Sequence, residues 1–404
     1  MNRQTLLAVT GAVWLAAGVV LALHGAPPPR PTRAGGGGKT AQASDYSLSG
    51  PWTHDNLTIF LIRGEDRSMG KTFLVLQEAL AAKKAIVHET EDVNLLHVEN
   101  VSKDVEVFIQ SGDIVKGGKQ DRVIAFDLVL PPKSGRVPVI AYCVDQARWR
   151  QRGNEAVGHF GSSTAQLPSK PLKFLAGSYG QLGGQAGQLG GPGGGQLGLG
   201  GGLTGGQAGG RGPMGAGQFG QPGGQFGLQG GGGQFGFQGG VWAEVASVQG
   251  RLRKNAGARE AGSSLQLTLQ DRKVEEAVGR YVRKLSPALE GQEGVVGFAW
   301  AVNGKVSGAE VYTSGELFRK LWPKLLKASA AEALAELRRG KPVPGVTAED
   351  VRACFADAAK GKKVEKDVTQ RVRVVLRETD RNILLETQDR EHKGAWVHRT
   401  YLTK

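Results

Sequence analysis

The 404-residue chain carries 51 Lys and Arg against 37 Asp and Glu, for a formal net charge of +14, and it contains 63 glycines and two cysteines. This charge is compatible with nucleic acid, anionic lipid or an anionic small ligand as partner, and equally with a solvated basic surface near an anionic membrane. No Cys-x-x-Cys occurs, which argues against a zinc ribbon or a thioredoxin-type site. Cys143 and Cys354 are expected either to pair outside the cytoplasm or to remain buried thiols.

An uncharged apolar stretch, residues 5–23, follows Arg3. As a helix it would rise about 28 Å, close to the thickness of a bilayer core, and the preceding positive charge predicts a cytoplasmic N-terminus. We expect residues 1–24 to be a membrane anchor of a single-pass protein whose domain lies outside the cytoplasm. The alternative is a cleaved signal peptide of a secreted or periplasmic protein, although His24 and the following prolines make a poor cleavage site. Residues 25–55 have the composition of a flexible linker.

The first ordered block, residues 56–175, is predicted to contain a sheet and one helix. Residues 57–62 are rich in β-branched side chains, which favours a strand. Residues 73–82 have a helical pattern and are followed by two lysines, which suit a helix C-terminus. Further strands, separated by polar turns, are predicted at 85–89, 94–100, 106–110, 123–130 and 137–144. Several adjacent short strands indicate a mainly antiparallel sheet.

Residues 176–240 form a Gly- and Gln-rich insert that repeats Gly-Gln-Leu-Gly and then Gly-Gln-Phe-Gly. Glycine has the largest entropy cost on ordering, and so little apolar surface cannot offset it, so we expect disorder. The regularly spaced Leu and Phe residues could act as stickers for weak self-association, or the segment is an inert, expanded loop. It lacks the strand–helix setting and the Lys-Ser/Thr pair of a phosphate-binding loop.

Residues 241–340 are predicted to continue the same domain, and residues 341–404 to add a C-terminal helix and strands. Asn303-Gly304 is a hairpin signal between two strands, and Thr347 is expected to cap a helix. The predicted helices cover 241–255, 271–285 and 314–337, with a kink expected at Pro323, and the closing strands cover 368–377, 383–388 and 395–402. Helices and strands come in runs, which predicts an α+β fold: mainly antiparallel sheets with packed helices, interrupted by the disordered Gly/Gln-rich insert.

The densest polar segment, residues 112–122, lies between two predicted strands and reads GDIVKGGKQDR. Its paired glycines allow a tight turn and a close approach to a ligand. Its cations can grip a carboxylate or phosphate, and a glutamine suits hydroxyls or amides. The candidate ligand-binding residues here are Gly117, Gly118, Lys119, Gln120 and Arg122, and the candidate acids or bases are Asp113 and Asp121. A plain hairpin on a solvated face has the same composition.

One strand later the chain reads Asp145-Gln146-Ala147-Arg148-Trp149. A tryptophan beside an arginine is a natural platform for a sugar or a base, so Gln146, Arg148 and Trp149 complete the candidate site. Trp149 could equally lie in the core under the sheet.

These segments, together with the stretch GFAWAVNGKVSGAEVYTSGELFRKLWPKLL, resemble the ARPP family, which is named for its association with ADP-ribosylglycohydrolase and rhodanese-phosphatase domains and is also described as a domain of unknown function. The resemblance covers both ordered blocks up to about residue 330. The family pattern is Gly-Glu, then Gly-Gly-Lys-Gln-Asn-Arg, then Glu-Gln-Gly-Arg-Trp. The chain matches it at Gly112, Gly117, Gly118, Lys119, Gln120, Arg122, Gln146, Arg148 and Trp149 and departs from it at Asp113, Asp121, Asp145 and Ala147. The family's associations imply a role near ADP-ribose or nucleotide-sugar chemistry.

Three functional hypotheses follow. The first is a module that binds a small anionic or nucleotide-like ligand. The second is a hydrolase for an ADP-ribose-like or sugar-phosphate substrate, with a carboxylate from Asp113, Asp121 or Asp145 in the same pocket. The third is a structural surface protein that acts through its insert. No cofactor and no metal are expected, because the histidines are scattered without a His-Glu-x-x-His pattern, and no Gly-x-Ser-x-Gly supports a serine hydrolase. No specific nucleic acid is expected as a partner, and the oligomeric state is left open.

Overall fold

The computed structural model describes residues 46–68, 70–90, 92–146, 148, 160–168, 170, 172–173, 233–259, 262–392 and 395–404. All of them belong to one compact unit, Thr40–Lys404. The predicted leader, most of the predicted insert and Trp149 lie outside the described residues, so the expectations for them stay predictions. Within the described ranges, no helix is both long and apolar enough to span a membrane.

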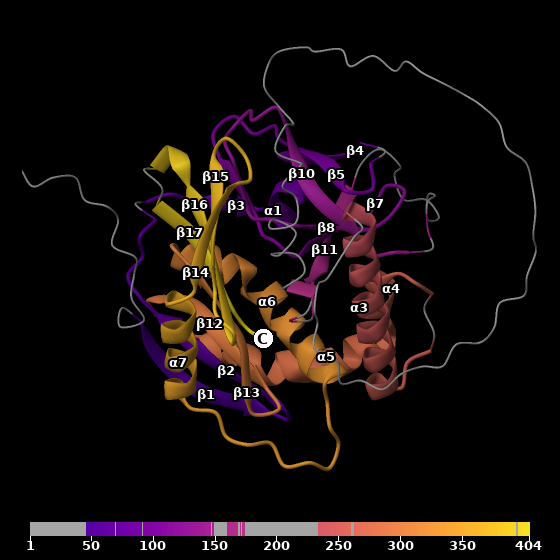
Figure 1. Ribbon diagram of the computed structural model, residues 1–404, viewed down its shortest axis with the longest axis vertical. Helices are drawn as coiled ribbons and strands as arrows, with labels where there is room; N and C mark the ends of the chain where they lie inside the picture. Colours follow the sequence, from indigo (N-terminus) through magenta and orange to yellow (C-terminus); the bar gives the residue numbers. More distant parts are fainter. Residues whose placement is uncertain are drawn as a thin grey trace, which may run out of the picture. The chain divides into compact units, whose positions relative to one another are not determined.

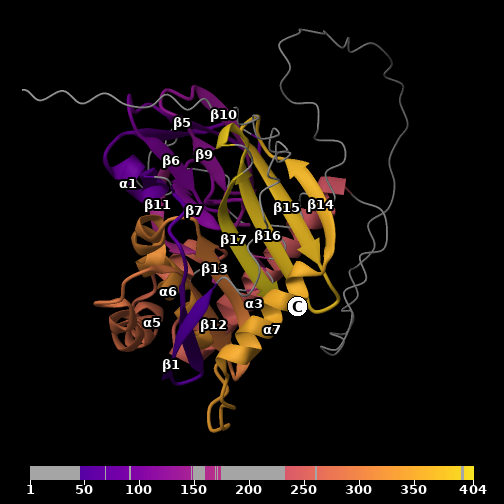
Figure 2. The ribbon, with the colours of Figure 1, turned by 90° about the vertical axis from the view of Figure 1, so that its left-hand side faces the viewer.

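An eight-stranded antiparallel sheet forms the larger layer, and Figure 2 shows its C-terminal strands side by side. Its order is β1 (Ser47–His54), β2 (Leu57–Arg63), β12 (Val295–Val302), β13 (Lys305–Tyr312), β17 (Ala395–Thr403), β16 (Asn382–Asp389), β15 (Val372–Glu378) and β14 (Lys362–Asp367). The predicted hairpin at Asn303-Gly304 joins β12 to β13. Both blocks of the sequence therefore contribute to one sheet, which makes them parts of a single fold.

Two smaller sheets hold the remaining strands. A six-stranded sheet has the order β11 (Phe160–Gln166), β7 (Asp113–Gly117), β8 (Arg122–Ile124), β10 (Arg136–Cys143), β5 (Leu95–Asn100) and β4 (Ala85–Glu89). A three-stranded sheet has the order β3 (Phe73–Val75), β6 (Glu106–Ile109) and β9 (Leu128–Leu130), in which β3 and β6 are parallel. The α+β class with mainly antiparallel sheets is thus confirmed.

The helices cover both faces of the large sheet. The described helices are α1 (Leu76–Ala81), α3 (Gly233–Ala256), α4 (Leu265–Leu269), α5 (Arg272–Leu285), the short 3-10 turn η2 (Ser286–Leu289), α6 (Gly315–Ala335), α7 (Ala348–Ala359) and the 3-10 turn η3 (Arg390–His392). α6 packs on β12 on one side and on α3 and α5 on the other (Figure 1). α7 covers the opposite face through Phe355, which packs against Tyr401 of β17.

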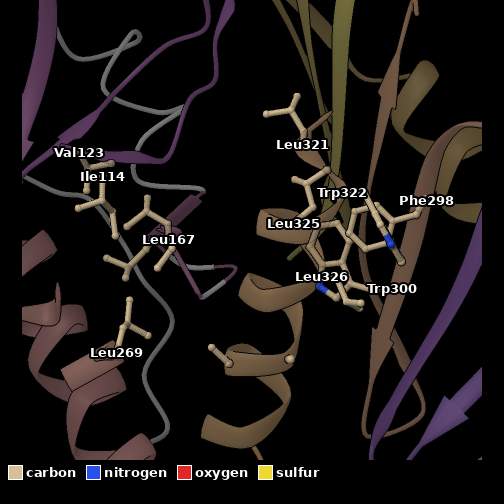
Figure 3. Packing of buried hydrophobic residues seen from close by; sticks show 14 of the residues in the cluster. Ile114, Val123, Leu167, Leu269, Phe298, Trp300, Leu321, Trp322, Leu325 and Leu326 are labelled. Carbon is tan, nitrogen blue, oxygen red and sulfur yellow. The ribbon is translucent and has the colours of Figure 1, made fainter. Parts of the chain in front are cut away.

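The core is densest between α6 and β12. Figure 3 shows the apolar stripe of α6 facing two aromatic rings of β12, and the residues it labels there are Leu321, Trp322, Leu325, Leu326, Phe298 and Trp300. The Phe298 and Trp300 rings stack with centroids 5.4 Å apart, and Trp322 meets Phe298 edge to face. The helix continues through Pro323. Trp300 and Trp322 are both buried there.

Several boundaries differ from the sequence expectations. The segment predicted as one helix begins as strand β3 and becomes helical at Leu76, and the strand predicted at 123–130 divides into β8 and β9. α3 begins at Gly233, inside the stretch predicted as insert. Strands β1, β7, β11 and β14 and helix α4 were not predicted; residues 112–122, which contain β7, were expected to lie between two strands. Cys143 and Cys354 are both buried and unpaired, which is the second of the two alternatives left open for them.

Candidate functional site

The hairpin of β7 and β8 carries the candidate turn. Val115 of β7 lies opposite Arg122 of β8, and Arg122 in turn lies opposite Cys143, the last residue of β10. Because neighbouring strands are antiparallel, the turn after β7 and the segment after β10 reach the same end of the six-stranded sheet. The two stretches that the sequence singled out, 25 residues apart, therefore meet in space.

Arg148 holds the two stretches together. Its Nε donates to Asp145 Oδ2 at 2.6 Å, one terminal nitrogen donates to Asp121 Oδ1 at 3.1 Å, and the other to the Gly118 carbonyl oxygen at 3.3 Å. Gln120 adds a second link, because its Nε2 donates to the Asp145 carbonyl oxygen at 3.1 Å. A guanidinium shared by two carboxylates fixes the geometry of the turn as well as its charge.

Asp121 and Asp145 are held from the other side by the start of α4. Ser264 Oγ donates to Asp121 Oδ2 at 3.0 Å, and Ser263 Oγ donates to Asp145 Oδ1 at 3.1 Å. Ser264 is also the N-cap of α4, where its Oγ accepts from Leu267 N. Asp121 accepts a further bond from Gly117 N. Sequence reasoning missed both serines, although a serine before a short apolar run is an N-cap signal.

Arg122 faces inward. Its side chain is fully buried, where one terminal nitrogen donates to Gln120 Oε1 at 3.0 Å and the other lies 3.8 Å from Glu89 Oε1. Burial lowers the pKa of the Arg122 guanidinium, although the nearby carboxylates of Glu89 and Asp121 act to raise it. Glu89 also accepts from Lys119 N. The Lys119 side chain is half-buried and Gln146 is exposed, so these two residues, with Arg148, form the solvent side of the site.

Asp113 lies at the opposite end of β7 from the turn. Gly117 lies four residue steps further along the strand, which corresponds to about 13 Å. Its carboxylate is buried and forms an ion pair with Lys324 of α6, with Oδ1 and Nζ 2.8 Å apart, and Gln166 Nε2 donates to the same oxygen at 3.2 Å. Asp113 and Asp121, the two carboxylates named as catalytic candidates, therefore lie in different surroundings.

A second buried polar cluster was missed by sequence reasoning. His398 of β17 lies between two carboxylates, with Nδ1 2.7 Å from Asp127 Oδ2 and Nε2 2.9 Å from Glu310 Oε2. Thr387 Oγ1 donates to Asp127 and Thr400 Oγ1 donates to Glu310. Burial opposes a charged ring, but the two carboxylates outweigh it and raise the pKa of His398 to about 9. The residues of this cluster are scattered along the chain, so no sequence pattern indicated that they would meet.

The same cluster extends toward the core of the large sheet. Lys173 Nζ lies 3.1 Å from Glu310 Oε1 and 4.3 Å from the centre of the Trp300 ring. Burial opposes ionisation of Glu310, but Lys173 and His398 outweigh it and lower the pKa of Glu310 to about 2. The Tyr312 ring stacks on His398 at 4.3 Å. Both nitrogens of His398 are engaged by carboxylates, so the ring is a fixed cation that joins strands.

Gly118 gives a local test of the turn. Its φ is +55°, and a Cβ placed there would collide with the Phe160 ring and come within 2.8 Å of Glu89 Oε2. We expect Gly118→Ala to lower the free energy of unfolding by about 2 kcal/mol, because it adds left-handed strain to overpacking. Urea unfolding measures this, with Gly135→Ala as the control, since Gly135 also has a positive φ but an added Cβ there meets no atom within 4 Å. An equal cost for both variants would contradict a packed turn.

Among the described residues, no group of three or more His, Cys, Asp or Glu side chains is arranged to hold a metal ion. The sequence profile of the ARG and Rhodanese-Phosphatase-superfamily-associated Protein domain matches residues 45–175 and 227–402. These ranges take in the described strands and helices of the fold, apart from Thr403 at the end of β17. No curated protein and no solved structure matches the chain.

Proposed function

We propose that this chain, which belongs to the family of the ARG and Rhodanese-Phosphatase-superfamily-associated Protein domain, binds a small ligand with an anionic group at the turn between β7 and β8. The observation that carries the proposal is the position of Arg148, which bonds to Asp145, Asp121 and the Gly118 carbonyl oxygen at once. Through it, the Gly-Gly-Lys-Gln-Asp-Arg turn and the Asp145–Arg148 stretch present one joint surface.

The chemistry of that surface favours a ligand with a single anionic group and several hydroxyls. Three cations, Lys119, Arg122 and Arg148, are matched by three carboxylates, Glu89, Asp121 and Asp145. Because the charges of this cluster balance, it does not attract a polyanion strongly. The Lys119 ammonium on its solvent side can nevertheless contact one phosphate or carboxylate. The exposed amide of Gln146 can donate to and accept from hydroxyls, as a sugar or nucleotide requires.

The same contacts favour binding over hydrolysis. Asp121 is fully buried and accepts bonds from Gly117 N, Ser264 Oγ and Arg148. A general acid or base must lie within hydrogen-bond reach of the substrate, and each of these donors holds the carboxylate away from solvent. Asp113 serves a buried ion pair at the other end of β7. Catalytic roles for Asp113 and Asp121 therefore stay predictions, and turnover is an outcome to be measured beside binding.

The cellular setting rests on the leader. We propose that residues 1–24 hold the chain in a membrane, with the binding domain outside the cytoplasm, since 19 uncharged residues after a single arginine suit a spanning helix. A signal peptide that is cleaved would place the same domain in the same compartment.

Lys119→Met tests the ligand. We expect a thermal-shift screen of ADP-ribose, AMP, sugar phosphates and free sugars to yield a stabilising ligand, and Lys119→Met to weaken its binding about tenfold or more, because a charge-assisted hydrogen bond is lost. Lys116→Met is the matched control, since it removes the same charge from a half-buried position on β7.

Equal weakening by both variants, or no stabilising ligand of this class, would contradict the proposal. If the ligand is consumed, and Asp121→Asn still binds it but no longer consumes it, the hydrolase hypothesis replaces the binding hypothesis.

A further inference from the structure

Two helices that are distant in the sequence meet at one end of the described domain. The Arg339 guanidinium, just after α6, donates to the Asn255 carbonyl oxygen of α3 at 3.0 Å. The Asn255 side-chain amide donates in return to the carbonyl oxygens of Leu334 and Ala335, at 2.7 and 3.1 Å. The C-terminal ends of α3 and α6 are therefore joined to each other.

Two more segments reach the same end. The tip of the β12–β13 hairpin is attached there because Asn303 Nδ2 donates to the Glu336 carbonyl oxygen at 2.9 Å. The loop after α6 lies against that tip, since a Cβ on Gly304 would come within 2.7 Å of Pro344. The start of α5 joins through Lys273 Nζ, which donates to the Gly257 carbonyl oxygen at 2.7 Å. Figures 1 and 2 both show the loop between α6 and α7 projecting at the lower edge of the view, beyond the strands.

This arrangement gathers exposed cations, which together we name the basic end: Lys254, Lys273, Lys305, Arg338, Arg339 and Lys341. Within the part of the chain that the structure describes, none of them forms an ion pair, whereas cations elsewhere commonly do, as Arg371 does with Asp389 and Arg399 with Glu386. Three acids lie at the same end: Asp271 is the N-cap of α5, Glu336 is the C-cap of α6, and Asp55 precedes Asn56, whose amide donates to Asn303. The six cations outnumber these three carboxylates, so the basic end carries a net positive charge.

An exposed apolar side chain lies within the basic end. Val343 is 37% exposed, which makes it one of few large apolar residues at the described surface. It follows Lys341 in the sequence Arg-Arg-Gly-Lys-Pro-Val-Pro and has a proline on each side. Proline restricts the backbone, so the loop presents its apolar tip in a nearly fixed shape. Cations around a small apolar tip are the chemistry of proteins that rest on the interface of an anionic bilayer.

We propose that the basic end docks on an anionic lipid surface, with Val343 among the headgroups. Lipid fits better than nucleic acid because single strands are bound by exposed aromatic rings, and the large apolar side chains exposed on the described residues are Val101, Leu267, Val343 and Val364. The docking does not depend on the ligand site at Lys119, which lies on the six-stranded sheet. Docking of the basic end would add a reversible membrane contact to the one proposed for residues 1–24.

A fluorescent label on Val343→Cys in the full chain tests the docking. Cys143 and Cys354 are buried, so an environment-sensitive dye reacts with the introduced thiol. We expect a blue shift of the dye with vesicles of phosphatidylglycerol and phosphatidylcholine, no shift with phosphatidylcholine alone, and loss of the shift in high salt. Removing three charges with Arg338→Gln, Arg339→Gln and Lys341→Gln should lower the affinity for the anionic vesicles about a hundredfold.

Val364→Cys is the matched control, because Val364 is similarly exposed but belongs to the edge strand β14, and its dye should not shift. The leader is the same in the Val343, Val364 and triple variants, so a difference between these variants cannot come from it. A shift in neutral vesicles, a response of the Val364 label, or an unchanged response in the triple variant would overturn the proposal. Binding of DNA that depends on the same three charges, without a vesicle signal, would also overturn it.

Discussion

Replacing His398 with glutamine is expected to lower the free energy of unfolding by about 3–5 kcal/mol, the usual cost of removing one partner from a buried ion pair. His398 is buried between Asp127 and Glu310, which both lie within hydrogen-bond distance of its ring. Glutamine can form a hydrogen bond to one carboxylate but supplies no charge. Lys173 would still pair with Glu310, whereas Asp127 would lose the cation that it pairs with.

The stabilisation by His398 depends on pH in a defined direction. Its pKa rises from the ordinary 6.5 to about 9 in the fold, so its contribution is complete below about pH 6.5 and is lost as the pH rises through about 9. Glu310 shifts from 4.5 to about 2, so its contribution is present above about pH 4.5 and is lost as the pH falls toward 2. The cluster is therefore expected to stabilise the fold most between about pH 4.5 and 6.5.

Urea unfolding of the wild type and of His398→Gln at pH 6 and pH 9.5 measures both effects. The difference between the two proteins should be large at pH 6 and smaller at pH 9.5. His97→Gln is the control, because His97 is half-buried on β5 and none of the described acids pairs with it. A pH-independent difference, or an equal cost for His97→Gln, would contradict a charged His398.

Arg148→Met is expected to cost about 3 kcal/mol or more, because it leaves two buried carboxylates, Asp121 and Asp145, without their shared cation. Methionine keeps much of the length and the apolar stem of arginine, so the loss reports on charge and hydrogen bonds more than on packing. The β7–β8 turn should also lose its fixed geometry, since the bond to the Gly118 carbonyl oxygen disappears.

A double-mutant cycle with Asp121→Asn isolates the pair. Asparagine can accept from Gly117 N through its carbonyl oxygen and donate to Ser264 Oγ through its amide nitrogen, which reverses the second bond, while it removes the negative charge. In the Asp121→Asn background, Arg148→Met should therefore cost at least 1 kcal/mol less, in the range of coupling for residues in contact. Additive costs would show that Arg148 does not act through Asp121.

Periodic patterns in the sequence predicted the regular parts of the fold. The helix predicted at 271–285 forms as α5, and of the apolar face expected there Val274, Val278, Tyr281 and Leu285 are buried, whereas Val282 is partly buried. The Asn303-Gly304 hairpin forms because asparagine and glycine accept the positive φ of the turn. Thr347 and Asp350 form the predicted capping box of α7. Each of these signals is local, and local physics decides the structure there.

Elements that depend on distant partners were not predictable. β14 is a mostly exposed edge strand with five charged residues in its six, so it shows no apolar alternation and is defined by pairing with β15. The first turns of α3 read GQFGFQGG, which has low helix propensity, and the helix packs on α6. β1 begins within a stretch whose composition resembles a linker, and it forms because it pairs with β2.

The sequence indicated which two segments form the candidate site but not the hydrogen bonds and ion pairs between them. The turn at Gly117-Gly118 and the segment of Arg148 lie together because β8 leads away from that end of the sheet and β10 returns to it. Ser263 and Ser264 complete the cluster through bonds to residues that lie 118 and 143 positions earlier in the chain. The inward direction of Arg122 is likewise not indicated by any local pattern. The second cluster likewise depends on distant contacts. Pairing of β13 with β17 brings Glu310 to His398, and Asp127 reaches them from the segment between β8 and β9.

The position of bound ligand tests the central claim most directly, that the turn and the Arg148 stretch form one binding surface. We would follow backbone amide chemical shifts by nitrogen-edited NMR while the ligand identified in the thermal-shift screen is added. Saturable changes are expected at Gly117, Gly118, Lys119 and Gln146, with the same midpoint for all. Changes confined to other parts of the fold, with these four amides unmoved at saturation, would contradict it.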